Sequence, residues 1–199
     1  LLSKKCKLVD KVYVSTDCKK MFQISKNYDV NLKKLRAKHL STSKALTIDV
    51  IKNVISEKKI KDSYILLLQA TSPFRTLEMT NSFLKKFKKN KNANSSVSLT
   101  RFFHPHPEKI QIIKKKFVKS YLNKESMRPR QYLPEVYCLN GLFYIAKSEQ
   151  LVKKKSFFSN KTSPFIVKHD QSLNLDLPDD LLILKDKIKK KIINQNFLK

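Results

Sequence analysis

Glycine is almost absent from this chain: Gly141 is the single glycine among 199 residues. Walker-type and dinucleotide-binding loops need several glycines, because their backbones adopt unusual φ angles and approach phosphate groups closely. The sequence therefore excludes both kinds of Gly-rich phosphate loop, and any bound nucleotide must be held by other elements. Hydrophobic residues make up 41% of the chain, enough for one buried core, and we expect residues 1–199 to form a single domain.

The net charge of +27, from 43 basic and 16 acidic residues, would suit a polyanionic partner such as nucleic acid. Only five of the basic residues are arginine, whereas the guanidinium group is the usual reader of bases and phosphates. The lysines also fall in short runs, such as 85–91 and 114–116, that are typical of solvated surfaces. We interpret most of the charge as background and keep a basic nucleic-acid-binding protein as the alternative.

The cysteines and the hydropathy pattern indicate where the chain works. Cys6, Cys18 and Cys138 have no paired spacing, and their odd number argues against a disulfide framework or a zinc pair. The longest apolar runs are far shorter than the ~20 residues that span a bilayer. We expect a cytoplasmic protein with no membrane partner.

Strand-like and helix-like segments alternate along the chain, which predicts an α/β domain with a mainly parallel sheet. The run at 64–68 is continuously apolar, as in a strand that is covered on both faces. The other expected strands are 12–15, 96–99 and 142–145, and the expected helices lie around 21–28, 45–55, 83–87 and 178–188.

The segment from Phe102 to Val136 differs from the rest of the chain. Four prolines interrupt it, and Ile110 to Val118, around the lysines at 114–116, resembles a hairpin. We expect an arm over 102–136 that leaves the sheet and meets a second copy of itself in a two-fold dimer.

Ligands of such sheets bind beyond the carboxyl ends of the strands, so the segments that follow strands are the candidate sites. Polar residues gather after the strands at 15–17 and 69–76, and a rare arginine pair at 128–130 precedes the Asn140-Gly141 step. Alternation over 172–176 places Asn174 and Asp176 on one side of an expected strand. Oxygen ligands in this arrangement suit Mg²⁺, which completes its shell with water and substrate phosphate.

Six segments, in the same order, resemble the acylneuraminate cytidylyltransferases, also called CMP-sialic acid synthetases. The segments are VYVSTD, RAKHLSTSKALTIDV, LLLQATSPFRT, HPEK, RPRQYLPEVYCLNGLFYI and SLNLDLPDDL. This resemblance, from about residue 8 to 184, implies a Rossmann-like nucleotide-diphospho-sugar transferase fold with an inserted dimerisation arm. It also implies a homodimer that transfers CMP from CTP to a nine-carbon 2-keto sugar acid and releases pyrophosphate.

The resemblance assigns roles to individual residues. Asp176, with Asn174, would bind Mg²⁺, while Lys109 and Arg130 would engage the sugar or its carboxylate. Arg130, Lys109 and Asp176 are therefore the catalytic candidates. The candidate substrate-binding residues are Gln69 for the sugar, Arg36 for the nucleotide, and Thr71, Ser72 and Asn140.

The chemistry fits these residue types. A guanidinium fork grips a carboxylate with two hydrogen bonds, and Mg²⁺ and cations offset the charge that develops at the α-phosphorus. Positioning and charge neutralisation dominate such transfers, so no Ser-His-Asp or Cys-His set is expected, and we interpret the four histidines as loop residues.

The sequence also departs from the family pattern. Asn174 and Cys138 stand where the family has aspartate and arginine, and Ala70 replaces a proline. In the family, a first strand and a loop rich in Gly, Lys and Arg precede the VSTD segment. Because this sequence starts too late to contain them, we expect that strand to be absent and an unpaired position to remain in the sheet beside 12–15. The alternatives are a truncated enzyme, a degenerate enzyme and a non-catalytic dimer partner.

Overall fold

The computed structural model describes residues 2–28, 30, 34–122 and 127–190. Its main sheet has four strands in the order β1-β5-β2-β6. Three of them, β1, β2 and β6, run in the same direction, and β5 alone runs against its two neighbours. Because three of the four strands share one direction, the expected mainly parallel sheet is confirmed. The sequence did not predict the reversed direction of β5. The strands are β1 (Tyr64–Leu67), β2 (Ser95–Phe102), β5 (Val136–Lys147) and β6 (Thr162–Val167).

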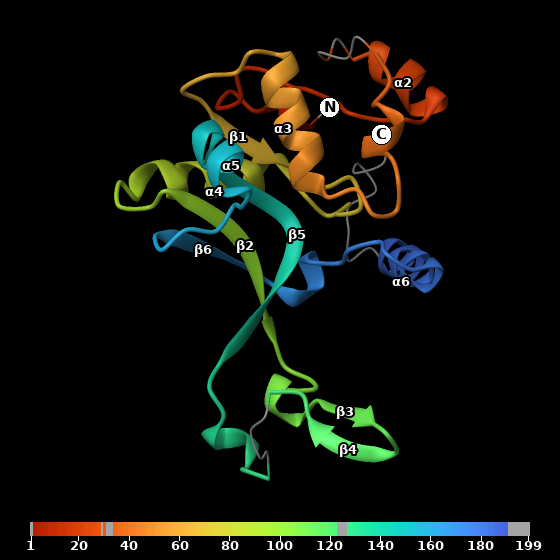
Figure 1. The fold of residues 1–199 in the computed structure, drawn as a ribbon, viewed down its shortest axis with the longest axis vertical. Helices are drawn as coiled ribbons and strands as arrows, with labels where there is room; N and C mark the ends of the chain where they lie inside the picture. The colour runs from red at the N-terminus through yellow and green to blue at the C-terminus, as the bar shows by residue number, and fades with distance from the viewer. Residues whose placement is uncertain (1, 29, 31–33, 123–126, 191–199) are drawn as a thin grey trace.

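Helices cover both faces of the sheet (Figure 1). On one face α3 (Thr47–Glu57) and α5 (Ser148–Lys154) pack on one core, which includes Ile55 and Leu151. On the other face α4 (Leu77–Lys89) carries Phe83, whose ring stacks on Phe143 of β5 at 4.8 Å between centroids. The short α1 (Leu2–Lys5) leads to the buried Cys6 on the α4 side. The Rossmann-like layering of helix, sheet and helix follows from these two cores.

Strand β1 contributes to both cores, as its continuous apolarity predicts. Ile65 and Leu67 pack against the α3 side, whereas Leu66 and Leu68 pack against the α4 side.

A bulge interrupts the pairing of β5 with β2. The register moves from Val97 opposite Tyr144 to Leu99 opposite Leu139, so β5 holds extra residues between them. Inside the bulge, Ser98 donates a 2.5 Å hydrogen bond to Asn140 Oδ1 and accepts one from the Phe143 backbone N–H at 2.8 Å. The bulge is therefore held by buried hydrogen bonds from a serine of the neighbouring strand.

Past Thr100, where the pairing of β2 with β6 ends, β2 and β5 continue together out of the sheet as a two-stranded ribbon that leads to the expected arm (Figure 1). The arm contains the antiparallel hairpin β3 (Gln111–Lys114) and β4 (Phe117–Ser120), which confirms the hairpin predicted over 110–118. Two 3₁₀ turns, Pro107–Lys109 and Arg130–Tyr132, complete its described part.

Two expected strands are absent from the described residues. Val12–Ser15 is irregular, and Ser172–Asp176 is an irregular segment that follows the 3₁₀ turn His169–Gln171. Both segments have strand-like composition, but a strand also needs a hydrogen-bonded neighbour along its length. In the 172–176 segment, the Leu175 N–H donates such a backbone bond to the Thr71 carbonyl at 2.8 Å.

The expected helices are confirmed, with boundaries that shift by a few residues. The first expected helix is α2 (Lys19–Lys26), and α6 (Pro178–Lys189) begins at the predicted proline. A 3₁₀ turn, Lys38–Leu40, precedes α3, whose N-cap residue is Leu46. Among the described residues, no helix is both long and apolar enough to cross a bilayer.

We predict that Ser98→Ala lowers the free energy of unfolding by about 1–3 kcal/mol, because the buried Phe143 N–H and Asn140 Oδ1 both lose a partner. Urea denaturation followed by circular dichroism measures the change. The matched control is Ser82→Ala on the exposed side of α4, which should alter stability by less than about 0.5 kcal/mol. Equal effects of the two substitutions would contradict a structural role of the Ser98 hydroxyl.

Candidate active site

Three polar side chains from two segments, the loop after β1 and residues 172–176, meet at Gly141. A Cβ placed on Gly141 would lie 2.5 Å from Gln69 Oε1, 2.9 Å from Ser72 Oγ and 3.3 Å from Asn174 Oδ1. The φ angle of Gly141 is +74°, a conformation that L-residues rarely adopt. The single glycine of the chain therefore stands where the end of β1, the β5 bulge and the 172–176 segment converge, and we call Gln69, Ser72, Gly141 and Asn174 the glycine cluster.

The side chain of Arg75 links the end of β1 to the β5 bulge by hydrogen bonds. Its Nε donates to the Leu142 carbonyl and its Nη2 to the Gln69 carbonyl, both at 2.9 Å. The guanidinium carbon lies 5.5 Å from the centroid of the Phe143 ring. Burial lowers the pKa of Arg75 to about 10, so the group remains a cation at neutral pH. Arg75 thus ties the carboxyl end of β1 to the β5 bulge and positions Gln69.

Asn174 and Asp176 point to the same side, as their spacing predicts, although the segment is no strand. Asn174 Nδ2 donates to Asp176 Oδ2 at 2.6 Å, and Ser72 Oγ donates to Asn174 Oδ1 at 3.0 Å. The carboxylate of Asp180 accepts the backbone N–H groups of Asp176 and Leu177 and so fixes the turn into α6. The pair thus joins the glycine cluster through Ser72.

The side-chain oxygens of Asn174 and Asp176 are the candidate ligands for Mg²⁺. The described residues hold no group of three or more His, Cys, Asp and Glu that could bind a metal. Asp176 offers one exposed carboxylate, and Asn174 offers a neutral amide oxygen. Mg²⁺ is often bound by one or two carboxylates plus water and phosphate oxygens, so this small set fits a metal that arrives with a nucleotide.

Two of the predicted substrate-binding residues differ in their exposure to solvent. Asn140 is buried, and its side chain is bonded to Ser98 and, through Nδ2, to Thr100 Oγ1 at 2.9 Å. Thr71 is exposed beside the glycine cluster, and its carbonyl receives the Leu175 N–H. The Asn140 amide therefore shapes the bulge beneath the site, whereas Thr71 lies at its surface.

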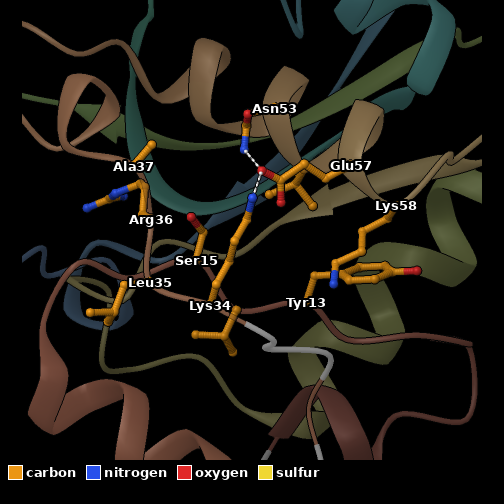
Figure 2. Close-up of a pocket in the computed structure, with 11 residues that line it drawn as sticks. Tyr13, Ser15, Lys34, Leu35, Arg36, Ala37, Asn53, Glu57 and Lys58 are labelled. Carbon is orange, nitrogen blue, oxygen red and sulfur yellow. Dashed lines mark hydrogen bonds and ion pairs between the residues drawn. The ribbon is translucent and has the colours of Figure 1, made fainter.

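Arg36 lines a pocket of about 330 Å³ (Figure 2) and also the adjoining larger cavity that Gln69 and Thr71 line at the end of β1. Its Nη2 donates to Asp17 Oδ1 at 2.6 Å and its Nε to Ser41 Oγ at 3.2 Å. A backbone hydrogen bond and the Arg36 guanidinium both lower the pKa of the Asp17 carboxyl. Lys34 and Asn53 bond to Glu57 across the same pocket, so several of its polar groups are already paired. The structure does not join Arg36 to the glycine cluster by a direct hydrogen bond among the described residues.

The two arm candidates lie with the arm, which projects away from the sheet (Figure 1). Arg130 bonds to the His104 ring nitrogen and donates to the Phe103 carbonyl at 3.3 Å. Lys109 Nζ donates to the Arg128 carbonyl at 2.8 Å. Within one chain, Arg130 and Lys109 are therefore separated from the glycine cluster by the length of the ribbon.

Sequence reasoning missed two features of the site. The clamp role of Arg75 was not assigned, although its position six residues after Gln69 on the strand-to-helix turn was visible. His104 was interpreted as a loop histidine, and it lies against Arg130. A histidine two residues after the end of β2 gives no signal by itself that an arginine 26 positions later will meet it.

Comparisons with known proteins agree with the fold and the motifs. The chain is 27% identical over 193 residues to the post-translational flagellin modification protein B of Campylobacter coli, covering 95% of this chain and 81% of that protein. It is 28% identical over 184 residues to the CMP-N,N'-diacetyllegionaminic acid synthase of Legionella pneumophila, covering 86% and 75%.

A solved structure has the same fold. The CMP:2-keto-3-deoxy-manno-octonic acid synthetase complexed with CTP superposes with a TM-score of 0.65 over 96% of this chain and 85% of that chain, at 12% identity. The model of one family, described as cytidylyltransferase, matches residues 3–195. Because this match spans almost the whole sequence, the chain belongs to the cytidylyltransferase family of nucleotidyltransferases.

Proposed function

We propose that this chain transfers CMP from CTP to a nine-carbon 2-keto sugar acid. The observation that carries the proposal is the meeting of Gln69, Ser72 and Asn174 at Gly141, beside Asp176, at the carboxyl end of β1. This is the edge at which α/β sheets bind ligands. The relative named as a CMP-N,N'-diacetyllegionaminic acid synthase supports the substrate class.

In the proposed reaction, the anomeric hydroxyl of the sugar attacks the α-phosphorus of CTP. A sugar oxygen–phosphorus bond forms, the bond from the α-phosphorus to the bridging oxygen breaks, pyrophosphate leaves, and the hydroxyl proton passes to solvent. The Gln69 amide both donates and accepts, which suits the orientation of a polyhydroxylated substrate. Arg75 keeps Gln69 in place through its 2.9 Å bond to the Gln69 carbonyl and is therefore a positioning residue.

Asp176 and Asn174 would hold Mg²⁺, which offsets the negative charge of the triphosphate when it is bound. The side chains of the pair are already adjacent, with Asn174 Nδ2 and Asp176 Oδ2 at 2.6 Å. Since Asn174 contributes no charge, we expect this chain to bind the metal weakly and to turn CTP over slowly.

The arm would act in a homodimer. Its hairpin and loop expose large apolar side chains, among them Ile113 at 79%, Phe117 at 71% and Met127 at 85% exposure. Apolar surface of this extent favours a partner surface, and a two-fold dimer covers it on both copies. The arm is also basic, whereas Asp176, Asp179 and Asp180 form an exposed or half-exposed acidic turn. Arg130 and Lys109 would thus reach the partner's site and grip the carboxylate of the sugar.

We predict that Asn174→Asp strengthens binding of Mn²⁺, used as a probe for Mg²⁺, at least tenfold, and that Asp176→Ala removes the binding. One added unit charge at ~4 Å and an effective dielectric of ~20 attracts the cation by about 4 kcal/mol before desolvation is subtracted. Electron paramagnetic resonance of free Mn²⁺, with and without CTP, measures the affinity, and CMP-sugar formation should rise with it.

The matched control for charge is Asp179→Asn, in the exposed first turn of α6. It removes a carboxylate near the pair without removing either proposed ligand, so its effect on Mn²⁺ affinity should be less than about threefold. If Asp179→Asn weakens binding as much as Asp176→Ala, or if Asn174→Asp gains nothing, the metal assignment is wrong.

We also predict that two inactive variants complement each other. In a dimer whose arms act on the partner's site, mixing Arg130→Ala with Asp176→Ala chains creates one intact site per mixed dimer. Random exchange should therefore restore roughly a quarter of the wild-type rate of pyrophosphate release. Mixing Lys109→Ala with Arg130→Ala chains is the matched control, because both lesions lie on the arm and no intact site can form. Absence of recovery in the first mixture, once mass spectrometry has verified subunit exchange, would contradict action across the dimer.

A further inference from the structure

The arginine side chains of this protein differ in what holds them. Three of the five are paired with carboxylates at 2.6 or 2.7 Å, namely Arg36 with Asp17, Arg101 with Glu135 and Arg128 with Glu108. Arg75 is half-buried and is held by two backbone carbonyls. Arg130 is exposed and has no carboxylate partner among the described residues. Its positive charge therefore remains available at the surface to an anionic ligand.

Two acceptors on neighbouring residues hold the Arg130 guanidinium. Nη1 donates to Nε2 of the His104 ring, and Nη2 donates to the Phe103 carbonyl at 3.3 Å. A guanidinium group has five N–H donors and accepts no hydrogen bond. The two contacts therefore leave three donors for a ligand, which is enough for a grip on a carboxylate with two hydrogen bonds.

The contact with Arg130 fixes the state of the His104 ring. Because Arg130 can only donate, Nε2 must accept, and the ring is neutral with its proton on Nδ1. A neutral acceptor holds the guanidinium without cancelling its charge. An aspartate or glutamate at position 104 would also hold it, but would lower its attraction for the carboxylate of a ligand. An imidazole is therefore suited to present a guanidinium that must still bind an anion.

The contact also joins the two sides of the arm. His104 lies two residues past the end of β2, and Arg130 begins the 3₁₀ turn Arg130–Tyr132 on the returning side. The 26 positions between them include the hairpin of β3 and β4. His104 thus ties Arg130 to the end of a strand that is anchored in the main sheet.

We propose that His104 is a positioning residue for Arg130 and that it acts only as a neutral imidazole. This inference rests on the proposed function, in which Arg130 grips the carboxylate of the sugar acid. A protonated ring could not accept from Arg130 and would repel it, so the carboxylate would be bound less tightly. The nearby Arg101, whose guanidinium lies 5.1 Å from the Phe103 ring centroid, is paired with Glu135, so this pair adds little net charge beside His104.

Steady-state kinetics with the whole chain test the positioning role. The substrates are CTP and N,N'-diacetyllegionaminic acid, the sugar acid in the name of the Legionella relative. His104→Leu removes the acceptor, so KM for the sugar acid should rise about tenfold, while kcat and KM for CTP should change less than about twofold. His104→Gln keeps an acceptor oxygen near the position of Nε2 and should retain most of the wild-type affinity.

A double variant tests whether His104 acts through Arg130. Isothermal titration calorimetry measures binding of the same sugar acid, so the test does not need turnover. His104→Leu should weaken binding in the wild-type background and should have no further effect in an Arg130→Ala background. An equal loss in both backgrounds would overturn the proposal.

The pH profile separates positioning from a purely structural contact. Between about pH 8 and pH 5, where imidazole side chains gain a proton, kcat/KM for the sugar acid should fall about tenfold more in the wild type than in His104→Gln. The phosphates of CTP also titrate, but they do so for both proteins, so the ratio of the two profiles isolates His104. The matched control is His39→Gln, in the exposed 3₁₀ turn Lys38–Leu40, whose profile should equal that of the wild type.

Nuclear magnetic resonance examines the contact without the reaction. Long-range ¹H–¹⁵N spectra at about pH 8 should show the Nδ1–H tautomer of His104, and Arg130→Ala should remove this preference. Absence of that tautomer, an unchanged KM in His104→Leu, or equal pH profiles for the wild type and His104→Gln would overturn this inference and leave the proposed function standing. A wild-type chain that neither binds the sugar acid nor forms a CMP-sugar would overturn the proposed function and this inference with it.

Discussion

The partly buried guanidinium of Arg75 makes the interactions on which the rest of the site depends. It joins the end of β1 to the bulge of β5, through the carbonyl of Leu142 in β5 and that of Gln69, two residues past β1. A carbonyl at the end of a strand must find a donor when water is excluded, and a planar cation can serve two such carbonyls at once. Burial lowers its pKa to about 10, a shift that leaves the cation intact near neutrality. Lysine could not reproduce this geometry, because its ammonium is a single point charge.

The bulge of β5 explains why one glycine suffices for the chain. Ser98 and Thr100 of β2 turn their hydroxyls toward Asn140, and the backbone then passes Gly141 with a positive φ angle. At that point a Cβ would lie 2.5 Å from Gln69 Oε1 and 2.9 Å from Ser72 Oγ, so both side chains would have to move to admit it. Elsewhere the chain forms its turns with other residues, including five non-glycine residues at positive φ among the described positions.

The sequence patterns predicted the helices and most of the strands, but they did not predict how the strands are arranged in the sheet. Apolar periodicity located α4 and α6, and the continuous run at 64–68 correctly indicated a strand covered on both faces, because these patterns report local burial. Strand direction is not encoded in periodicity, so the reversal of β5 could not be read from 142–145. Composition also misassigned Val12–Ser15, since β-branched residues favour a strand only where a neighbouring strand is available.

Prediction of the site succeeded where a residue's role is local and failed where it depends on distant partners. The i, i+2 spacing of Asn174 and Asp176 correctly placed both side chains together. Asn140, by contrast, lies in a buried network whose other members are about 40 positions earlier in the chain. No pattern around Asn140 identifies Ser98 and Thr100 as its partners.

The hydrogen-bonded ladder between β2 and β5 is interrupted on the way from the sheet to the arm. On the arm side of the bulge the strands are paired from Leu99 and Leu139 outward to Phe102 and Val136, and on the core side pairing resumes at Val97 and Tyr144. Strand β2 nevertheless stays paired with β6 from Ser95 to Thr100, across the whole interruption, so the sheet holds it on both sides of the bulge. Among the described residues, the ribbon has no third strand only beyond Thr100, and a rotation of the arm is absorbed there. Gly141 and its neighbours Gln69, Ser72 and Asn174 therefore stay fixed to the sheet when the arm moves.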